Sequence, residues 1–295
     1  MAEPAFIVER FVAGDGYPLR YRRYPAWGMV ASRPAPLPKG EGRNVRGAVV
    51  VIHGIQSHAG WYGHSCQRLS EAGFEVFFLD RRGSGMNERE RGDAPGFRCL
   101  IDDIAEFIRY RPERGLPVYL VAISWGGKLA VALQRRHPGL VAGMALICPG
   151  FFPRVSLTLR QRLKLFRCRL SDPTRLFPVP LDDPALFTAS PCWQQFLRDD
   201  PMSIHQATAR FLLESARLDM YLRICARQVT APTLLLLAGR DRIIHNGPTR
   251  RFVRRFAARD KRIIEYPEAH HTLEFEPNPE VFIGDLTNWL GSMKG

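Results

Sequence analysis

The stretch VYLVAISWGG, residues 118–127, decides the fold of this chain. Its first six residues form an apolar run that predicts a buried strand, and residues 128–136 carry apolar side chains at helical spacing. Ser124 then lies on the sharp turn between strand and helix, with its hydroxyl exposed. A strained elbow of this kind needs small neighbours, and Gly126 meets that need. The motif predicts a nucleophile, but it is short, and an ordinary strand-to-helix loop has the same signature.

Segments typical of strands and helices alternate along the chain, which predicts an α/β sheet. Residues 6–11 and 19–24 are two apolar-alternating runs separated by Gly-Asp-Gly, so we expect an antiparallel pair at one edge of the sheet. The other predicted strands are 47–52, 74–79, 117–123, 141–147, 233–238 and 262–266, and the other predicted helices are 61–72, 97–109, 249–258 and 279–290.

The alternation breaks down between residues 151 and 228, where proline recurs and helical segments dominate. No strand of convincing length is predicted there. We therefore expect a helical cap over 151–228, inserted into a core domain made of residues 1–150 and 229–295. A chain of 295 residues, of which 45% are hydrophobic, can bury such a core.

The cysteines and the N-terminal sequence indicate in which cellular compartment the protein is expected. The six cysteines are scattered, and none belongs to a cluster with metal-ligand spacing, so we expect reduced thiols and no metal site. The N-terminus lacks the charged and apolar regions of a secretory signal, and no window reaches the roughly 18 apolar residues of a spanning helix. These features predict a cytoplasmic protein.

The net charge of +13 is high, and only five of the 42 basic residues are lysines. Basic residues cluster at 160–169 and 250–261, which favours attraction to anionic lipid or to an acidic substrate. No zinc finger, RNA-binding signature or helix-turn-helix accompanies the charge, so we expect no role in binding nucleic acid.

Polar residues that follow the predicted strands supply the partners of a serine nucleophile. Acyl transfer by a serine needs a histidine base, a carboxylate that orients the base, and donors for the oxyanion. Asp241 follows the strand 233–238, and His270 and His271 follow the strand 262–266. Reactive groups of α/β sheets gather at the carboxyl ends of strands, and the order Ser, Asp, His is the one that α/β-hydrolases use.

The oxyanion donors are expected from two loops. His53 and Gly54 follow the strand 47–52, beside the predicted elbow. We assign the donors to the main-chain N–H groups of Ile55 and Trp125. His53 precedes the serine in a position suited to holding this loop by hydrogen bonds, so it is not expected to act as the base.

With these residues the chain resembles the α/β-hydrolase superfamily, most closely its monoacylglycerol lipase and lysophospholipase-like group. The resemblance implies an α/β-hydrolase fold, with a mostly parallel eight-stranded sheet, helices on both faces and an inserted helical cap. It also selects His271 over His270, because the family's base lies two residues after a small residue and two before a leucine. The matching stretches are residues 53–62, 79–85, 123–127, 237–241 and 269–273.

The chain departs from the family's pattern in two places. Gln56 stands where these lipases often carry a second glycine, and Ala122 replaces the first glycine of the usual elbow G-x-S-x-G. Alanine adds only one methyl group, so we expect the elbow to tolerate it. Both departures leave the predicted mechanism intact but weaken the inference of a particular substrate.

The predicted activity is that of a serine carboxylester hydrolase, acting through an acyl-enzyme on Ser124 with His271 as base and Asp241 as its orienting acid. No cofactor is required, and Gly83 and Gly85 lack the rest of a dinucleotide motif. Two alternatives stay open. The same triad can serve a thioesterase, an amidase or an acyltransferase, and an α/β-hydrolase fold can also be kept as a non-catalytic binding protein.

The predicted cap bears on the substrate. In residues 155–170, one helical face carries Leu159, Leu163, Phe166 and Leu170, and basic residues occupy much of the rest. Such a helix either lies on a membrane surface as a lid or, in the simpler interpretation, packs its leucines on the core. In both cases the cap suits an apolar acyl chain, so we expect a small-molecule ester of a lipid or medium-chain alcohol, with peripheral membrane contact as one option.

Overall fold

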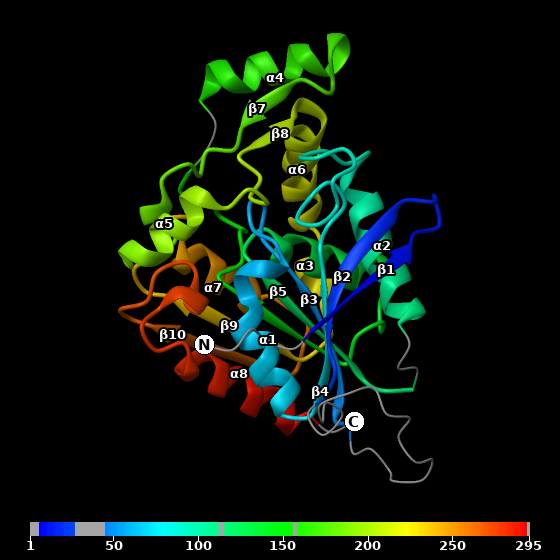
Figure 1. The fold of residues 1–295 in the computed structure, drawn as a ribbon, viewed down its shortest axis with the longest axis vertical. Coiled ribbons are helices and arrows are strands. Elements are labelled where there is room, and N and C mark those ends of the chain that lie inside the picture. The colour runs from blue at the N-terminus through cyan, green and yellow to red at the C-terminus, as the bar shows by residue number, and fades with distance from the viewer. Residues whose placement is uncertain (1–5, 27–44, 112–114, 156–157, 294–295) are drawn as a thin grey trace.

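The structure is a computed structural model of the chain, and it describes residues 6–26, 45–111, 115–155 and 158–293. A sheet of eight strands runs through the centre, in the order β1-β2-β4-β3-β5-β6-β9-β10 (Figure 1). β2 is antiparallel to both of its neighbours, and the remaining pairs are parallel. The strands are β1 (Ile7–Val12), β2 (Pro18–Tyr24), β3 (Gly47–Ile52), β4 (Phe74–Leu79), β5 (Val118–Ile123), β6 (Gly143–Ile147), β9 (Thr233–Ala238) and β10 (Lys261–Tyr266).

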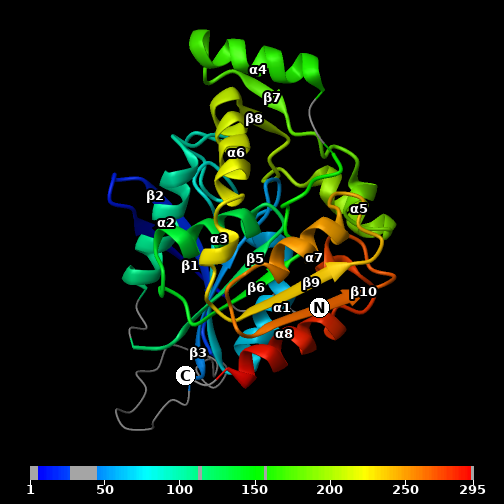
Figure 2. The same ribbon diagram turned by 180° about the vertical axis from the view of Figure 1, so that it is seen from behind.

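The central strands are apolar along their whole length because both faces of the sheet are covered. Every residue of β3, β4, β5, β6 and β9 is buried. α1 (Gly63–Glu71) and α8 (Glu280–Ser292) contact each other on the face towards the viewer in Figure 1. α3 (Gly126–Arg136) and α7 (Asn246–Arg254) lie on the opposite face, seen in Figure 2, where α2 (Phe97–Tyr110) packs beside α3. The predicted fold class is thus confirmed.

Two of the helices differ most from the predictions. The segment predicted as a helix from residue 61 begins as a 3₁₀ turn, η1 (Ala59–Tyr62), because the His58 side chain caps the main-chain N–H of Gly60 and sets the start there. α7 begins and ends earlier than the predicted 249–258. Among the described residues, no helix has the length and apolar character needed to cross a membrane.

Most of the chain between β6 and β9 lies beyond the carboxyl ends of the central strands, and its elements α4, β7 and β8 are at the top of Figures 1 and 2. Sequence analysis missed one feature of this segment, a two-stranded antiparallel sheet of β7 and β8. Each of these strands has only three residues, which is too short to show a period of two. The elements are α4 (Leu159–Ser171), β7 (Leu176–Pro178), η2 (Pro184–Leu186), α5 (Pro191–Asp199), β8 (Gln206–Thr208), α6 (Ala209–Leu222) and η3 (Ala226–Gln228).

The orientation of α4 contradicts the simpler of the two interpretations, in which the predicted apolar face packs on the core. Leu159, Leu163 and Phe166 are 73%, 55% and 60% exposed. The side chains that α4 buries are Leu165 and Cys168, in a small cluster with residues of β7 and α6. The helix presents this other face inward because α6 and the short sheet lie beneath it. The side chain of Leu170, predicted on the apolar face, lies outside the described part of the chain.

Candidate active site

Ser124 follows β5 directly and has a backbone φ of 50°, in the left-handed region. Its main-chain N–H donates to the Ile147 carbonyl at the end of β6, at 2.9 Å. A Cβ atom on Gly126 would lie 2.6 Å from the carbonyl oxygen of His53 and 2.7 Å from that of Ile52. Glycine is therefore required because β3 and its loop pass close by. Ala122 is fully buried, and the sheet accommodates its methyl group.

The carboxyl ends of β5, β9 and β10 bring three predicted residues together. The hydroxyl oxygen of Ser124 lies 2.9 Å from Nε2 of His271. On the other side of the imidazole ring, Nδ1 lies 2.7 Å from Oδ2 of Asp241. His271 is 2% and Asp241 4% exposed, so water barely reaches these contacts. The arrangement can pass a proton from the serine hydroxyl to the imidazole.

Asp241 is held as an anion. Its second oxygen, Oδ1, accepts the main-chain N–H groups of Ile243 and Ile244, at 2.8 and 2.9 Å. Burial alone would raise the pKa of this carboxyl, but the His271 ring and the two N–H donors outweigh burial, and the pKa lies below its ordinary value. The carboxylate therefore accepts the Nδ1 proton of His271 and leaves Nε2 free to act as a base.

The neighbouring His270 points to a different partner. Its main-chain N–H donates to Oε1 of Glu276 at 2.8 Å, and its ring Nδ1 lies 3.1 Å from the same oxygen. Of the two histidines that sequence analysis weighed, the structure brings His271 to Ser124.

The loop after β3 passes directly beside the serine. A Cβ atom on Gly54 would lie 3.2 Å from Cβ of Ser124. Ile55 and Trp125 line the same cavity as Ser124. In the described part of the chain, neither of their main-chain N–H groups has a hydrogen-bond partner. Both donors are therefore available to a developing oxyanion.

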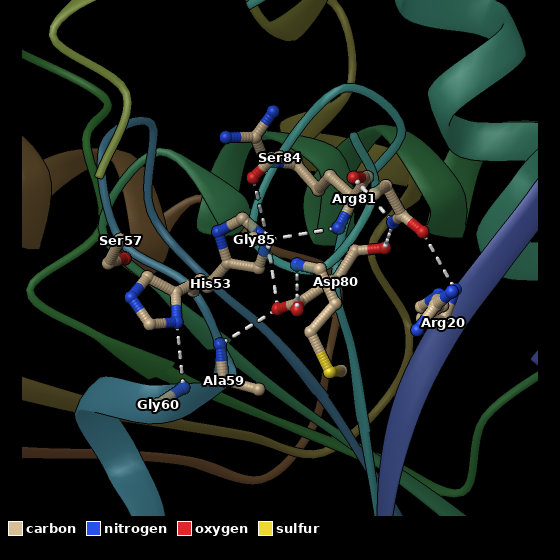
Figure 3. A network of polar contacts seen from close by, with 12 residues as sticks. Arg20, His53, Ser57, Ala59, Gly60, Asp80, Arg81, Ser84 and Gly85 are labelled. Carbon is tan, nitrogen blue, oxygen red and sulfur yellow. Dashed lines mark hydrogen bonds and ion pairs between the residues drawn. The ribbon is translucent and has the colours of Figure 1, made fainter. Parts of the chain in front are cut away.

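His53 is buried behind this loop and is not within reach of Ser124 as a base. Its Nε2 accepts the main-chain N–H of Arg81 at 2.9 Å (Figure 3), so Nδ1 carries the proton that the Gly54 carbonyl accepts, at 2.8 Å. Burial lowers the pKa of His53 far below its ordinary value, with a further contribution from the Arg81 cation. The neutral ring thus holds the loop, as sequence analysis expected of it.

Sequence analysis matched residues 79–85 to the family but gave them no role. Asp80 is completely buried and accepts the main-chain N–H groups of Ala59 and Met86, at 2.8 and 2.9 Å (Figure 3). A Cβ on Gly85 would collide with the Asp80 carboxyl. The carboxylate therefore joins the turn after β4 to the start of η1. Its position directly after a buried strand was the available signal.

A cavity of about 450 Å³ opens at Ser124 between the core and the residues that follow β6. Its walls are mostly apolar, and they include Leu165, Phe166, Leu212 and Leu213 from α4 and α6. The main polar feature is an ion pair of 2.6 Å between Lys128 of α3 and Asp219 of α6. The cavity can accept an apolar chain whose ester carbon reaches Ser124.

A second, smaller cavity of about 140 Å³ adjoins the first, with Leu181 lining both. Phe187 lines the smaller cavity and contacts the His271 ring edge-on, with ring centroids 6.1 Å apart. Polar side chains are more frequent here, among them Gln56 and His205, which lie 3.1 Å apart through Nε2 and Nδ1. The buried Oε1 of Gln56 has no hydrogen-bond partner among the described residues.

Asp200, which sequence analysis did not single out, fastens the residues after β6 to the core. Its Oδ2 accepts hydrogen bonds from Nε2 of His58 at 2.8 Å, from Nε1 of Trp61 at 2.7 Å and from Oγ of Ser203 at 2.7 Å. Burial opposes ionisation, but the hydrogen bonds, led by that of His58, lower the pKa of Asp200 below its ordinary value. His58 and Trp61 lie 142 and 139 positions away in the chain, so no local sequence pattern indicates these contacts.

One group of described residues has the spacing to hold a metal ion. The ligand atoms of Cys148, Asp241 and His271 all lie within 4.8 Å of one another. Burial raises the pKa of the Cys148 thiol well above its ordinary value, which disfavours the thiolate that a metal prefers. The histidine and the aspartate are hydrogen-bonded to each other and to Ser124. This donor set fits a proton-transfer chain better than a metal site.

Comparison with known proteins identifies relatives of this chain and structures with the same fold. A family model described as serine aminopeptidase, S33, matches residues 43–278. A monoacylglycerol lipase of Mycolicibacterium smegmatis is 30% identical over 84% of this chain and 89% of its own length. The human monoglyceride lipase is 27% identical over 79% of this chain and 77% of its own length. The crystal structure of a monoacylglycerol lipase from Paleococcus ferrophilus has the same fold, with a TM-score of 0.80 and 22% sequence identity. The match covers 94% of this chain and 99% of that one.

Proposed function

The chain belongs to the serine aminopeptidase S33 family and is a serine hydrolase of the α/β-hydrolase fold. On this basis we propose that it cleaves carboxylic esters of lipid-like substrates, of the monoacylglycerol or lysophospholipid type, through an acyl-enzyme on Ser124. One observation carries the proposal. The hydrogen-bonded series Ser124, His271 and Asp241 ends at a mostly apolar cavity of about 450 Å³.

In the first step, Nε2 of His271 takes the proton of Ser124 while the serine oxygen bonds to the ester carbon. The carbonyl oxygen becomes an oxyanion that accepts the main-chain N–H groups of Ile55 and Trp125. When the tetrahedral intermediate collapses, the ester C–O bond breaks and His271 gives its proton to the departing alcohol. Asp241 keeps the imidazole oriented and stabilises its charged form.

In the second step, a water molecule takes the place of the alcohol. His271 removes a proton from this water as its oxygen bonds to the acyl carbon, and the oxyanion forms in the same hole. The intermediate then releases the carboxylic acid, and the proton returns from His271 to the oxygen of Ser124. Both steps use the same three side chains, so removing any one of them stops both.

The two cavities support an ester of a long apolar acid with a small polar alcohol. The larger cavity has apolar walls that suit an acyl chain, and the smaller one carries Gln56 and His205, which suit the hydroxyl groups of the alcohol. Monoacylglycerol lipases are also among the relatives of this chain.

Amide, thioester and acyl-transfer chemistry use the same triad and are the alternatives. The family description names an aminopeptidase, which must hold the ammonium group of a peptide with a carboxylate. Asp219 lines the larger cavity, but it is already paired with Lys128. This pairing favours the ester. A non-catalytic binding role is disfavoured because all three members of the triad are in place.

We further propose that residues 151–228 act as a cap and that α4 is its membrane-facing part. Leu159, Leu163 and Phe166 project from α4 with large exposed fractions. Exposed basic residues lie between them, namely Arg160, Arg162, Lys164 and Arg167. Apolar side chains among cations suit the surface of an anionic bilayer, where lipid esters reside.

A substrate panel tests the proposed function. Purified protein is offered monoacylglycerol, lysophospholipid, thioester and anilide substrates that share one acyl chain, and kcat/KM is measured for each. We expect the oxygen esters to be preferred by at least about tenfold, a difference of about 1.4 kcal/mol in transition-state binding. A preference for the thioester or the anilide at equal acyl length would overturn the ester assignment. Transfer of the acyl group to an added alcohol in preference to water would establish the acyltransferase instead.

A further inference from the structure

Arg81 follows β4 by two residues and is buried, with 5% of its surface exposed. Among the described residues, no carboxylate lies within ion-pair distance of its guanidinium, whereas the next residue, Arg82, is paired with Asp103 and Asp15. A buried cation that makes no ion pair costs stability, and attraction to the more distant Asp80 carboxylate only partly offsets this cost. Burial lowers the pKa of Arg81 to about 9, which leaves the cation in place at neutral pH. The burial of Arg81 is therefore not explained by a gain in stability.

The guanidinium of Arg81 is directed at the loop that follows β3. Its Nη2 atom donates to the carbonyl oxygens of Gly54, at 3.0 Å, and of Ile55, at 2.8 Å. The main-chain N–H of Arg81 donates to Nε2 of His53 (Figure 3), and the Nδ1 proton of His53 goes to the same Gly54 carbonyl. Arg81 therefore fixes the Gly54 carbonyl twice, once directly and once through His53.

The Gly54 carbonyl and the Ile55 N–H belong to one peptide unit. That unit is planar and trans, so its C=O and N–H bonds point in opposite directions. A carbonyl held by Arg81 and His53 thus sends the Ile55 N–H to the opposite side, where Gly54 packs against Ser124. A charge-assisted hydrogen bond at the oxygen also polarises the amide, which makes its N–H a stronger donor.

The second oxyanion donor belongs to a residue that Arg81 also touches. The guanidinium carbon lies 5.1 Å from the centre of the Trp125 ring, and the Phe211 ring lies 5.7 Å away on α6. The Trp125 ring is fixed from another direction by a hydrogen bond of 2.8 Å from Nε1 to Ser215. One cation therefore contacts both residues that carry the proposed oxyanion donors.

We propose that Arg81 is a positioning residue that holds the oxyanion hole, by orienting the Gly54–Ile55 peptide unit and by fixing Trp125. The inference rests on the proposed acyl transfer at Ser124, but not on the identity of the ester. The Nε atom of Arg81 has no hydrogen-bond partner among the described residues. The side chain thus leaves one of its own donors unsatisfied while it holds the two carbonyl groups.

Two substitutions test this role. Arg81→Met keeps the length and packing of the side chain without its donors, and Arg81→Lys keeps the charge but cannot reproduce the planar guanidinium. We expect Arg81→Met to lower kcat on p-nitrophenyl acetate by about 10- to 100-fold with KM changed by less than about 3-fold, and Arg81→Lys to lie between it and the parent. Affinity for a trifluoromethyl ketone, whose adduct with Ser124 carries an oxyanion, should fall by the same factor as kcat.

Arg82→Lys is the matched control, because Arg82 is an equally buried neighbour whose partners are Asp103 and Asp15. It should lower the melting temperature while leaving both kcat and the affinity for the trifluoromethyl ketone within about 2-fold of the parent. A folded Arg81→Met enzyme with kcat within about 2-fold of the parent overturns the inference, and so does a loss of kcat without a matching loss of ketone affinity. If Arg81→Met does not fold, kcat and ketone affinity are compared between Arg81→Lys and the parent instead, and the same two outcomes apply. A parent enzyme that turns over the acetate but no lipid ester refutes the lipid-ester proposal alone.

Discussion

Ser124 and His271 are separated by 147 positions in the chain, yet the serine oxygen lies 2.9 Å from Nε2 of the histidine. The contact exists because β5 and β10 are parallel members of one sheet and their carboxyl ends meet at the same edge. The adjacent His270 is bonded to Glu276 instead. The site therefore contains an internal control, since two consecutive histidines have different partners.

Replacing the two histidines separately tests which one is the base. His271→Ala should lower kcat by about 10⁴-fold or more, because no other described side chain is placed to take the serine proton. His270→Ala should lower it by less than about 10-fold, because it loses only a contact with Glu276. Steady-state kinetics on a soluble ester measure both. An inactive His270→Ala enzyme beside an active His271→Ala enzyme contradicts the assignment.

Asp241→Asn tests the orienting carboxylate. Asparagine keeps the shape but offers an N–H where the imidazole needs an acceptor, so kcat should fall by about 10³- to 10⁴-fold with little change in KM. Circular dichroism and thermal unfolding serve as the folding controls. A well-folded Asp241→Asn enzyme with more than about a tenth of the parent kcat would remove Asp241 from the mechanism.

The elbow predicts opposite results for two glycine–alanine exchanges. Gly126→Ala places a methyl group 2.6 Å from the His53 carbonyl oxygen and should cost about 1–3 kcal/mol of unfolding free energy, with a large loss of kcat. Ala122→Gly restores the usual elbow glycine and should cost only about 0.5–1 kcal/mol, with kcat nearly unchanged. Urea unfolding and kinetics measure both effects. A tolerated Gly126→Ala would show that the loop after β3 does not lie as close as described.

Asp200 predicts a pH dependence of stability. Its pKa in the folded protein is depressed, so its contribution is fully present above the unfolded value of about 3.9 and is lost as pH falls from there through the folded pKa. Asp200→Asn should cost about 1–3 kcal/mol at neutral pH, and less below pH about 4. Urea unfolding at several pH values measures the difference between the two proteins. A difference that stays constant down to pH about 3 contradicts the ionised, hydrogen-bonded Asp200.

The exposed face of α4 predicts lipid binding. Leu163→Glu should reduce binding to anionic phosphatidylglycerol vesicles, and activity on vesicle-borne monoacylglycerol, by about 5- to 20-fold while leaving hydrolysis of a soluble acetate ester unchanged. Val281→Glu is the matched control, because Val281 is 52% exposed and belongs to α8, which lies away from α4 (Figure 1). Sedimentation with vesicles measures binding. Equal effects of the two substitutions would show that α4 has no special role.

The sheet was predictable from the sequence for a physical reason. Strands β3, β4 and β9 are buried on both faces, so each is a continuous apolar run whose ends match the predicted 47–52, 74–79 and 233–238. The polar residues at the ends of these runs then located the candidate site. Its residues could be proposed from a single sequence because the order and placement of Ser124, Asp241 and His271 follow from the topology.

The remaining features depend on contacts between distant segments. Sequence left two orientations of α4 open, and the simpler one, with Leu159 and Leu163 on the core, was wrong. Basic and apolar residues occur all around the helix, and only its packing against α6 decides that Leu165 rather than Leu163 is buried. Arg81 and Asp200 were not assigned roles for the same reason. Their partners are main-chain carbonyls and ring N–H groups far along the chain, which no local pattern reveals.

Labelling followed by mass spectrometry determines whether Ser124 forms the acyl-enzyme. The folded protein is treated with a fluorophosphonate, digested, and the modified peptide is sequenced, with Ser124→Ala treated in parallel. We expect a single adduct on Ser124, no adduct on the Ser124→Ala protein, and loss of ester hydrolysis in proportion to labelling. A folded parent protein that stays unlabelled, or that is labelled at another residue while it hydrolyses esters, would contradict an acyl-enzyme on Ser124.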